Sequence, residues 1–124
     1  MRRTLFKSKI HRAVLTGAHL EYEGSIGVDR DLMDAADLAS YEKVHVLNLS
    51  TGARLETYVI EAPRGSGEIQ LNGPAARLGQ PGDRVLIVSY AEYEEEELAG
   101  HVPTVVRVDD RNRFLPELRS GTAV

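Results

Sequence analysis

The sequence predicts a mainly β fold, a small and partly closed β-barrel built from one domain of 124 residues. Short apolar runs recur along the chain at close spacing and are separated by turn residues, which is typical of strands. Few residues show helical spacing, so a barrel is favoured over a parallel sheet wound on both faces by helices. A domain of this length buries roughly two thirds of its unfolded surface, enough for one core without staples.

The first third of the chain predicts one strand and one helix. Residues 4–16 mix basic and apolar side chains and end at a glycine, which indicates a strand with Lys7, Lys9 and His11 on its polar face. Residues 29–38 place apolar side chains at helical spacing behind acidic positions that suit the helix dipole. We therefore expect a single short helix there.

The middle of the chain carries the clearest local signal. Residues 44–49 and 54–60 are rich in β-branched and aromatic side chains, and Ser50-Thr51-Gly52 lies between them. This pattern predicts two strands joined by a tight turn.

The remaining segments predict short strands and a brief helix. Residues 84–90 form the most apolar run, so we expect a strand buried on both faces that crosses the barrel core. Pro74 near the start of residues 73–78 favours a turn that enters a brief helix. The other expectations are a loop at 62–67, a strand at 68–71, a turn at 79–83, a solvated acidic stretch at 94–97, a strand at 102–108 and a loosely held tail from 109.

Composition excludes several classes of function. The chain has no cysteine, so disulfides and thiolate chemistry are absent and a cytoplasmic location is expected. The net charge of −4 with interspersed signs argues against nucleic-acid binding, and no apolar run is long enough to span a membrane. The four histidines, at positions 11, 19, 45 and 101, lack the spacing of common zinc sites, so we expect no metal.

Gly24 and Ser25 form a pair that self-cleavage chemistry requires. A hydroxyl that attacks the carbonyl before it needs an unusual backbone, which glycine tolerates and bulkier residues resist. Elimination across the Ser25 side chain and hydrolysis then leave a ketone-bearing pyruvoyl group at a new N-terminus. By itself, a Gly-Ser pair is most often only a loop dipeptide.

Other candidate residues lie on the predicted strands. Lys9 can meet a carboxylate, although a solvated basic edge looks the same. Arg54, Glu56 and Tyr58 share one strand face, which places a guanidinium fork near a phenol. Thr57 points to the opposite face of a regular strand, so a site shared with Tyr58 requires a bulge, a bend or a neighbouring subunit.

Asn72 and the residues after it allow two structural interpretations. They form either a turn with a helix cap or a set of backbone donors for an anion. Pro74 has no N–H to donate.

The order and spacing of several short fragments resemble the bacterial aspartate alpha-decarboxylase family over roughly residues 1–90. Pro74 departs from the family pattern, which usually has alanine there, whereas the N–H of Ala75 remains available. The fragments are Arg3-Thr4, Lys7-Ser8-Lys9-Ile10-His11-Arg12, Tyr22-Glu23-Gly24-Ser25, Asp34-Ala35-Ala36, Gly52-Ala53-Arg54, Thr57-Tyr58, Arg64-Gly65-Ser66 and Asn72-Gly73.

The resemblance implies a double-psi β-barrel that assembles as a homotetramer with active sites at subunit interfaces. It implies cleavage into residues 1–24 and 25–124, a pyruvoyl cofactor made from Ser25 without metal or pyridoxal phosphate, and conversion of L-aspartate to β-alanine for pantothenate and coenzyme A biosynthesis. The implied roles are proton donation by Tyr58, carboxylate binding by Lys9 and Arg54, support of cleavage or cofactor placement by Thr57 and Asn72, and lining of the pocket by His11, Tyr22, Gly73 and Ala75.

Two alternatives remain open at the level of sequence. A non-enzymatic barrel used for binding or assembly predicts a chain that is never cut, with Gly24-Ser25 as an ordinary loop. A pyruvoyl enzyme for another acidic amino acid is the second alternative, because Lys9 and Arg54 specify a second carboxylate better than its distance.

Overall fold

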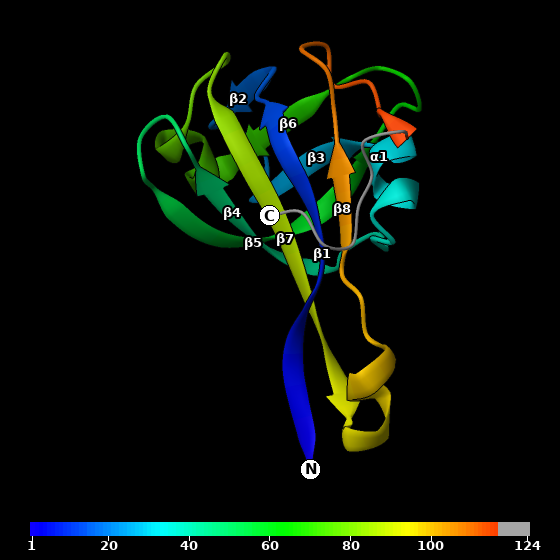
Figure 1. Ribbon diagram of the computed structural model, residues 1–124. Helices are drawn as coiled ribbons and strands as arrows, with labels where there is room; N and C mark the ends of the chain where they lie inside the picture. Colours follow the sequence, from blue (N-terminus) through cyan, green and yellow to red (C-terminus); the bar gives the residue numbers. More distant parts are fainter. Residues whose placement is uncertain (117–124) are drawn as a thin grey trace.

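The computed structural model describes residues 1–116, which form one mixed eight-stranded sheet in the order β2-β6-β3-β5-β4-β7-β1-β8 (Figure 1). This confirms the prediction of a mainly β fold. Within the described residues the two edge strands do not pair, so the sheet is not closed by hydrogen bonds but is compatible with a small β-barrel. The elements are β1 (Arg2–Val14), β2 (Gly17–His19), β3 (Ser25–Asp29), α1 (Arg30–Ala35), β4 (Lys43–Asn48), β5 (Arg54–Ala62), β6 (Ile69–Asn72), η1 (Gly73–Leu78), β7 (Arg84–Glu94), η2 (Glu95–Gly100) and β8 (Thr104–Arg107).

The inner face of the sheet forms the core. Ile10 pairs with Ile87, Ile87 with Val46, and Val46 with Leu55, so one row of apolar side chains crosses four strands. The first three are at most 1% exposed, and Leu55 packs against them. Each fully buried side chain of this kind stabilises the fold by about 1.5–3 kcal/mol.

The outer face of the same strands carries most of the polar candidates. Lys9 pairs with Val88, Val88 with His45, and His45 with Glu56, one position along from the core row. Because side chains alternate between the faces of a strand, Arg54 and Tyr58 share this outer face with Glu56.

Strand β1 confirms the first predicted strand, and it differs in detail on its polar face. The pairing with β7 shifts between Phe6 and Ser8, and Lys7 turns toward the end of α1, where its ammonium binds the Asp37 carbonyl oxygen at 2.6 Å and Glu42 at 2.8 Å. The Lys7 side chain therefore does not share one face of β1 with Lys9 and His11. The outer parts of β1 and β7 form a two-stranded ribbon that projects from the barrel toward η2 (Figure 1).

The segment at 84–90 is a strand, as predicted, but it is not buried on both faces. Val85, Ile87 and Ser89 are buried on the inner side, whereas on the outer side of this segment Val88 is buried, Leu86 is partly exposed and Tyr90 is 39% exposed. The strand continues to Glu94 because the N-terminal half of β1 pairs with it.

The helical predictions are confirmed in place and shortened in length. Helix α1 has six residues, begins after an Asp29 cap that accepts from the Asp31 N–H, and ends before Asp37, whose φ of 56° is left-handed. Residues 73–78 and 95–100 form 3₁₀ turns, and the second overlaps residues 94–97, which were expected to be a solvated acidic stretch and are exposed. None of the helices within residues 1–116 has the length and apolar character needed to cross a membrane.

The expected loosely held tail is fixed in its first part. Asn112 is 1% exposed, and its amide bonds the Val14 N–H, the Val14 carbonyl and the Gly67 carbonyl, each at 2.8 Å. Phe114 bridges to Val108 and packs on the core. The rest of the expected tail, residues 117–124, lies outside the described residues.

Candidate active site

Ser25 lies at the first position of β3, opposite Asn72 on the antiparallel strand β6. Its side chain is buried with only 2% exposure. The hydroxyl oxygen accepts a hydrogen bond from Asn72 Nδ2 at 3.0 Å and donates to the Glu23 carbonyl at 3.3 Å. A strand pairing of distant segments therefore holds the Gly24–Ser25 bond in a defined place.

Gly73 allows the turn after β6 to pack directly on this bond. Its φ is +66°, and a Cβ added there would lie 2.7 Å from both the nitrogen and Cα of Gly24 and 2.9 Å from the Tyr22 carbonyl oxygen. Such distances are sterically forbidden, so glycine is required for this close approach.

Asn72 leaves one polar atom without a partner. The residue is 3% exposed, and its Oδ1 is buried with no hydrogen bond from any described residue. A buried acceptor without a donor costs about 1–3 kcal/mol, which indicates a place where a water or hydroxyl group binds. This atom lies on the side chain that touches Ser25, so the residues present fit a group generated from that serine.

A pocket opens beside the Gly24–Ser25 bond. Gly24, Thr57, Tyr58, Pro74 and Ala75 line it, and the other lining residues are Leu55, Glu56 and Leu78. The pairing of β5 with β3 begins only at Val59, so residues 54–58 leave one edge of β5 free.

This free edge explains how Thr57 and Tyr58 share a pocket. The pairing of β4 with β5 is regular, with Val44 opposite Thr57 and Lys43 opposite Tyr58, so the two side chains do point to opposite faces. The bulge considered from the sequence is absent from this ladder. Both residues reach the pocket because it lies at the strand edge, not on one face.

Lys9 and His11 lie away from this pocket on β1. Lys9 is 7% exposed, and within residues 1–116 its ammonium has no hydrogen bond or ion pair. Burial and the charge of Arg107 lower the pKa of Lys9. Burial, followed by the charges of Lys9, Arg107 and Arg12, lowers the pKa of His11, whose Nδ1 is buried without a partner.

The distance between the two groups of candidates follows from the sheet order. Strands β1 and β5 are separated by β7 and β4, so Lys9 and Arg54 lie on backbones about 14 Å apart. The Lys9 ammonium lies 5.8 Å from the centre of the Phe6 ring. The charge of Arg107 acts on it from β8, which pairs with β1 on the side opposite to β7, β4 and β5. The described chain thus brings Thr57, Tyr58 and Ala75 to a pocket that Gly24 lines, and it buries Ser25, Asn72 and Gly73 next to Gly24. Lys9 and His11 lie apart from them.

Two further candidates border the pocket without lining it. Arg54 lies at the start of β5, is exposed, and lines an adjoining hollow with His45, Leu55 and Glu56. The Tyr22 side chain is 60% exposed and stacks on His19 at 4.8 Å, so only the Tyr22 backbone approaches Gly73.

Comparison with known proteins shows the family of this chain. The family model described as aspartate decarboxylase matches residues 1–115. The chain belongs to the aspartate decarboxylase family. The match extends about 25 residues beyond the roughly 90 that the sequence fragments covered, and it includes β8 and the segment held by Asn112.

Curated relatives in the aspartate decarboxylase family are similar over nearly their whole length. Aspartate 1-decarboxylase of Heliobacterium modesticaldum is 56% identical over 99% of this chain and 93% of the relative. The enzyme of the same name from Myxococcus xanthus is 57% identical over 94% of this chain and 89% of the relative. Aspartate 1-decarboxylase 1 of Gloeobacter violaceus is 56% identical over 93% of this chain and 98% of the relative.

Several residues that line this pocket were not predicted from the sequence. Leu55 and Leu78 form apolar walls, and the Glu23 carbonyl accepts from Ser25. Leu78 is the last residue of the segment predicted at 73–78, and its approach to β5 was not predicted. Glu56 was placed on the correct face, but its position on the pocket wall carried no sequence signal.

Proposed function

We propose that this chain converts L-aspartate to β-alanine and CO2, and that it first cleaves itself between Gly24 and Ser25 to generate a pyruvoyl group. Membership of the aspartate decarboxylase family supports the reaction, and the buried Ser25 held by Asn72 supports the origin of the group. The observation that carries the proposal is the burial of Ser25 beside Asn72, where Gly24 precedes the serine and Gly73 follows the asparagine.

Self-cleavage proceeds on residues of this chain. The Ser25 hydroxyl attacks the Gly24 carbonyl carbon, the Gly24–Ser25 C–N bond breaks, and the nitrogen takes up the hydroxyl proton, which leaves an ester. Loss of the Cα proton expels the Gly24 carboxylate and forms a double bond in residue 25. Addition of water then releases ammonia and leaves the ketone. Asn72 holds the hydroxyl, and its free Oδ1 accepts a hydrogen bond from the water.

The pyruvoyl group, when present, accepts the electrons of the bond that releases CO2. The task of the protein is to place the substrate and one proton. Arg54 binds a carboxylate with a planar fork and Lys9 with a point charge. Tyr58 follows Thr57 on the pocket edge and carries the hydroxyl proposed to return a proton to the former α carbon.

The proposed site contains residues of two chains in a homotetramer. Lys9 is buried without an anionic partner in the described part of its own chain, and it lies on the convex outer face three strands from Arg54. Side chains diverge on a convex face, so a neighbouring subunit is the proposed source of the lysine at each pocket. A cytoplasmic location completes the proposal and rests on the absence of cysteine.

Turnover of two acidic amino acids tests the function. The purified chain is incubated with L-aspartate or L-glutamate, and β-alanine and γ-aminobutyrate are quantified. We expect β-alanine from aspartate at a rate at least about tenfold above glutamate turnover, because a one-carbon mismatch misplaces one carboxylate. Tyr58→Phe should cleave normally but decarboxylate about 100-fold more slowly. A cleaved chain without β-alanine formation would refute the proposed reaction.

A further inference from the structure

Glu56 lies between two residues of the proposed aspartate site. It is two residues from Arg54 and two from Tyr58 on the outer face of β5, and it lines the pocket beside Gly24. Side chains two apart on a strand are about 6.6 Å apart at the backbone, within reach of a Glu–Arg ion pair. Glu56 is therefore a natural competitor for the Arg54 guanidinium.

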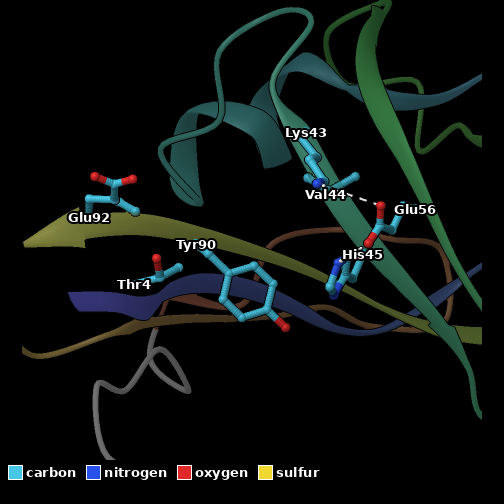
Figure 2. Close-up of a pocket in the computed structure, with 8 residues that line it drawn as sticks. Thr4, Lys43, Val44, His45, Glu56, Tyr90 and Glu92 are labelled. Carbon is cyan, nitrogen blue, oxygen red and sulfur yellow. Dashed lines mark hydrogen bonds and ion pairs between the residues drawn. The ribbon is translucent and has the colours of Figure 1, made fainter. Parts of the chain in front are cut away.

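The structure shows Glu56 bound elsewhere. Lys43 Nζ lies 3.5 Å from its Oε2, and His45 Nε2 lies 3.1 Å from its Oε1, so each carboxylate oxygen has its own partner on β4 (Figure 2). The charge of Lys43, followed by the hydrogen bond from His45, lowers the pKa of Glu56. Glu56 therefore carries a negative charge at neutral pH, and both of its oxygens are bound on β4.

Arg54, by contrast, has no ion pair or hydrogen bond with any residue of the range 1–116. Its cross-strand neighbour is Leu47, which offers no charge, whereas His45 stands opposite Glu56 and Lys43 opposite Tyr58. Of the two polar partners on β4, His45 stands directly opposite Glu56 and Lys43 reaches it from the next position, and neither contacts Arg54. His45 is also held from its other side by an edge contact with Tyr90, with ring centroids 5.0 Å apart.

We propose that Lys43 and His45 are positioning residues for substrate binding: they hold Glu56 on the side of β4 so that Arg54 remains available for a carboxylate of aspartate. This inference rests on the proposed function and adds to it a cause for the unpaired Arg54 guanidinium. Without these two contacts, Glu56 would pair with Arg54 on the wall of a pocket proposed to bind a dicarboxylate.

The test measures KM and kcat for L-aspartate in the double variant Lys43→Met/His45→Phe, in which the aromatic contact with Tyr90 is kept. We expect KM to rise about two- to fivefold, the range expected for one exposed ion pair, with kcat changed less than twofold. Adding Glu56→Gln should return KM to the wild-type value. Lys43→Arg should leave KM unchanged, because the cation is kept.

Succinate supplies a second measurement. It has both carboxylates of aspartate but no amine, so its inhibition constant measures the binding of the carboxylates alone. In the double variant this constant should rise by the same factor as KM. Arg2→Met is the matched control, since it removes an exposed cation that pairs with Glu94 at the far end of the β1–β7 ribbon. The Arg2→Met variant should leave KM for aspartate and the inhibition constant of succinate unchanged.

Three outcomes would overturn the inference. An unchanged KM in the double variant would show that Glu56 does not compete for Arg54. A raised KM that Glu56→Gln fails to restore would show that Lys43 and His45 act without Glu56. A wild-type chain that does not turn over aspartate would refute the proposed function first and this inference with it.

If circular dichroism shows that the double variant does not fold, the single variants Lys43→Met and His45→Phe are measured instead. Each single variant is expected to raise KM by less than the double variant.

Discussion

Asn72 and Ser25 form the closest polar contact at the proposed cleavage bond, and the sequence predicted both residues but not their contact. A neutral buried hydrogen bond contributes about 0.5–1.5 kcal/mol, so Asn72→Ala should slow self-cleavage about three- to tenfold. The rate is followed by intact mass. Gln70→Ala removes a side-chain amide from the same strand without touching Ser25 and should leave the rate unchanged. Equal rates in wild type and Asn72→Ala would contradict the role given to this contact.

His11 predicts a pH dependence of stability. Its pKa is lowered from 6.5 by burial and by the charges of Lys9, Arg107 and Arg12, so below pH 6.5 the unfolded chain binds more protons than the folded chain. Stability should therefore fall as the pH drops from about 7.5 to about 5.5, and less so in His11→Gln. Urea midpoints of the uncleaved Ser25→Ala chain, with and without His11→Gln, measure this. Identical pH slopes would contradict the prediction.

Three carboxyl groups with lowered pKa values do not interfere in that range of pH. The pKa values of Asp34, Glu56 and Asp109 are lowered from 3.8 or 4.5, chiefly by Arg64, Lys43 and backbone N–H groups respectively. Their contribution to stability is present above those values and is lost only as the pH falls further.

At the scale of elements, the segment after β8 acts as a strap across the barrel. Asn112 makes three hydrogen bonds to β1 and the loop at Gly67, and its φ of 60° suits asparagine better than alanine. Asn112→Ala should lower the free energy of unfolding by about 2–4 kcal/mol. Urea unfolding measures the loss, with Arg111→Ala as an exposed neighbour that should change little. A loss below about 0.5 kcal/mol would show that the strap is not fixed by Asn112.

The elements differ in how far the sequence reveals them. The β4–β5 hairpin was predictable because its turn and its strands are adjacent in the chain. Strand β3 was not, because all five of its residues are buried, so it shows no alternation, and its partners β5 and β6 are distant in sequence. The strap was not predicted either, because a polar tail gives no sign of the buried amide that Asn112 supplies.

At the scale of the whole molecule, the separation of Lys9 from the pocket predicts complementation between chains. Lys9→Ala and Tyr58→Phe are each expected to be nearly inactive. When the two are co-expressed and form mixed tetramers, about a quarter of the sites should receive both intact residues if each site combines two chains. Activity in the purified mixture measures this, and tetramers mixed from wild type and Arg2→Met serve as the control for assembly. No gain over the separate variants would place Lys9 and Tyr58 in the site of one chain.

The sequence proposed the candidate residues of the site but not their distribution over the strands. Family resemblance identified Ser25, Tyr58, Lys9 and Arg54 by their positions in the chain. The three strand spacings between β1 and β5 emerge only from long-range pairing, which no local pattern encodes. The contacts of Lys43 and His45 with Glu56, by contrast, lie within the local β4–β5 hairpin.

Intact mass of the purified wild-type chain beside Ser25→Ala tests the central claim most directly. We expect the wild type to separate into residues 1–24 and 25–124, with the larger fragment lighter by one ammonia than a fragment that begins with serine, and Ser25→Ala to remain whole. A wild-type chain that stays intact after warm incubation, or a Ser25→Ala chain that is still cut after Gly24, would contradict the claim.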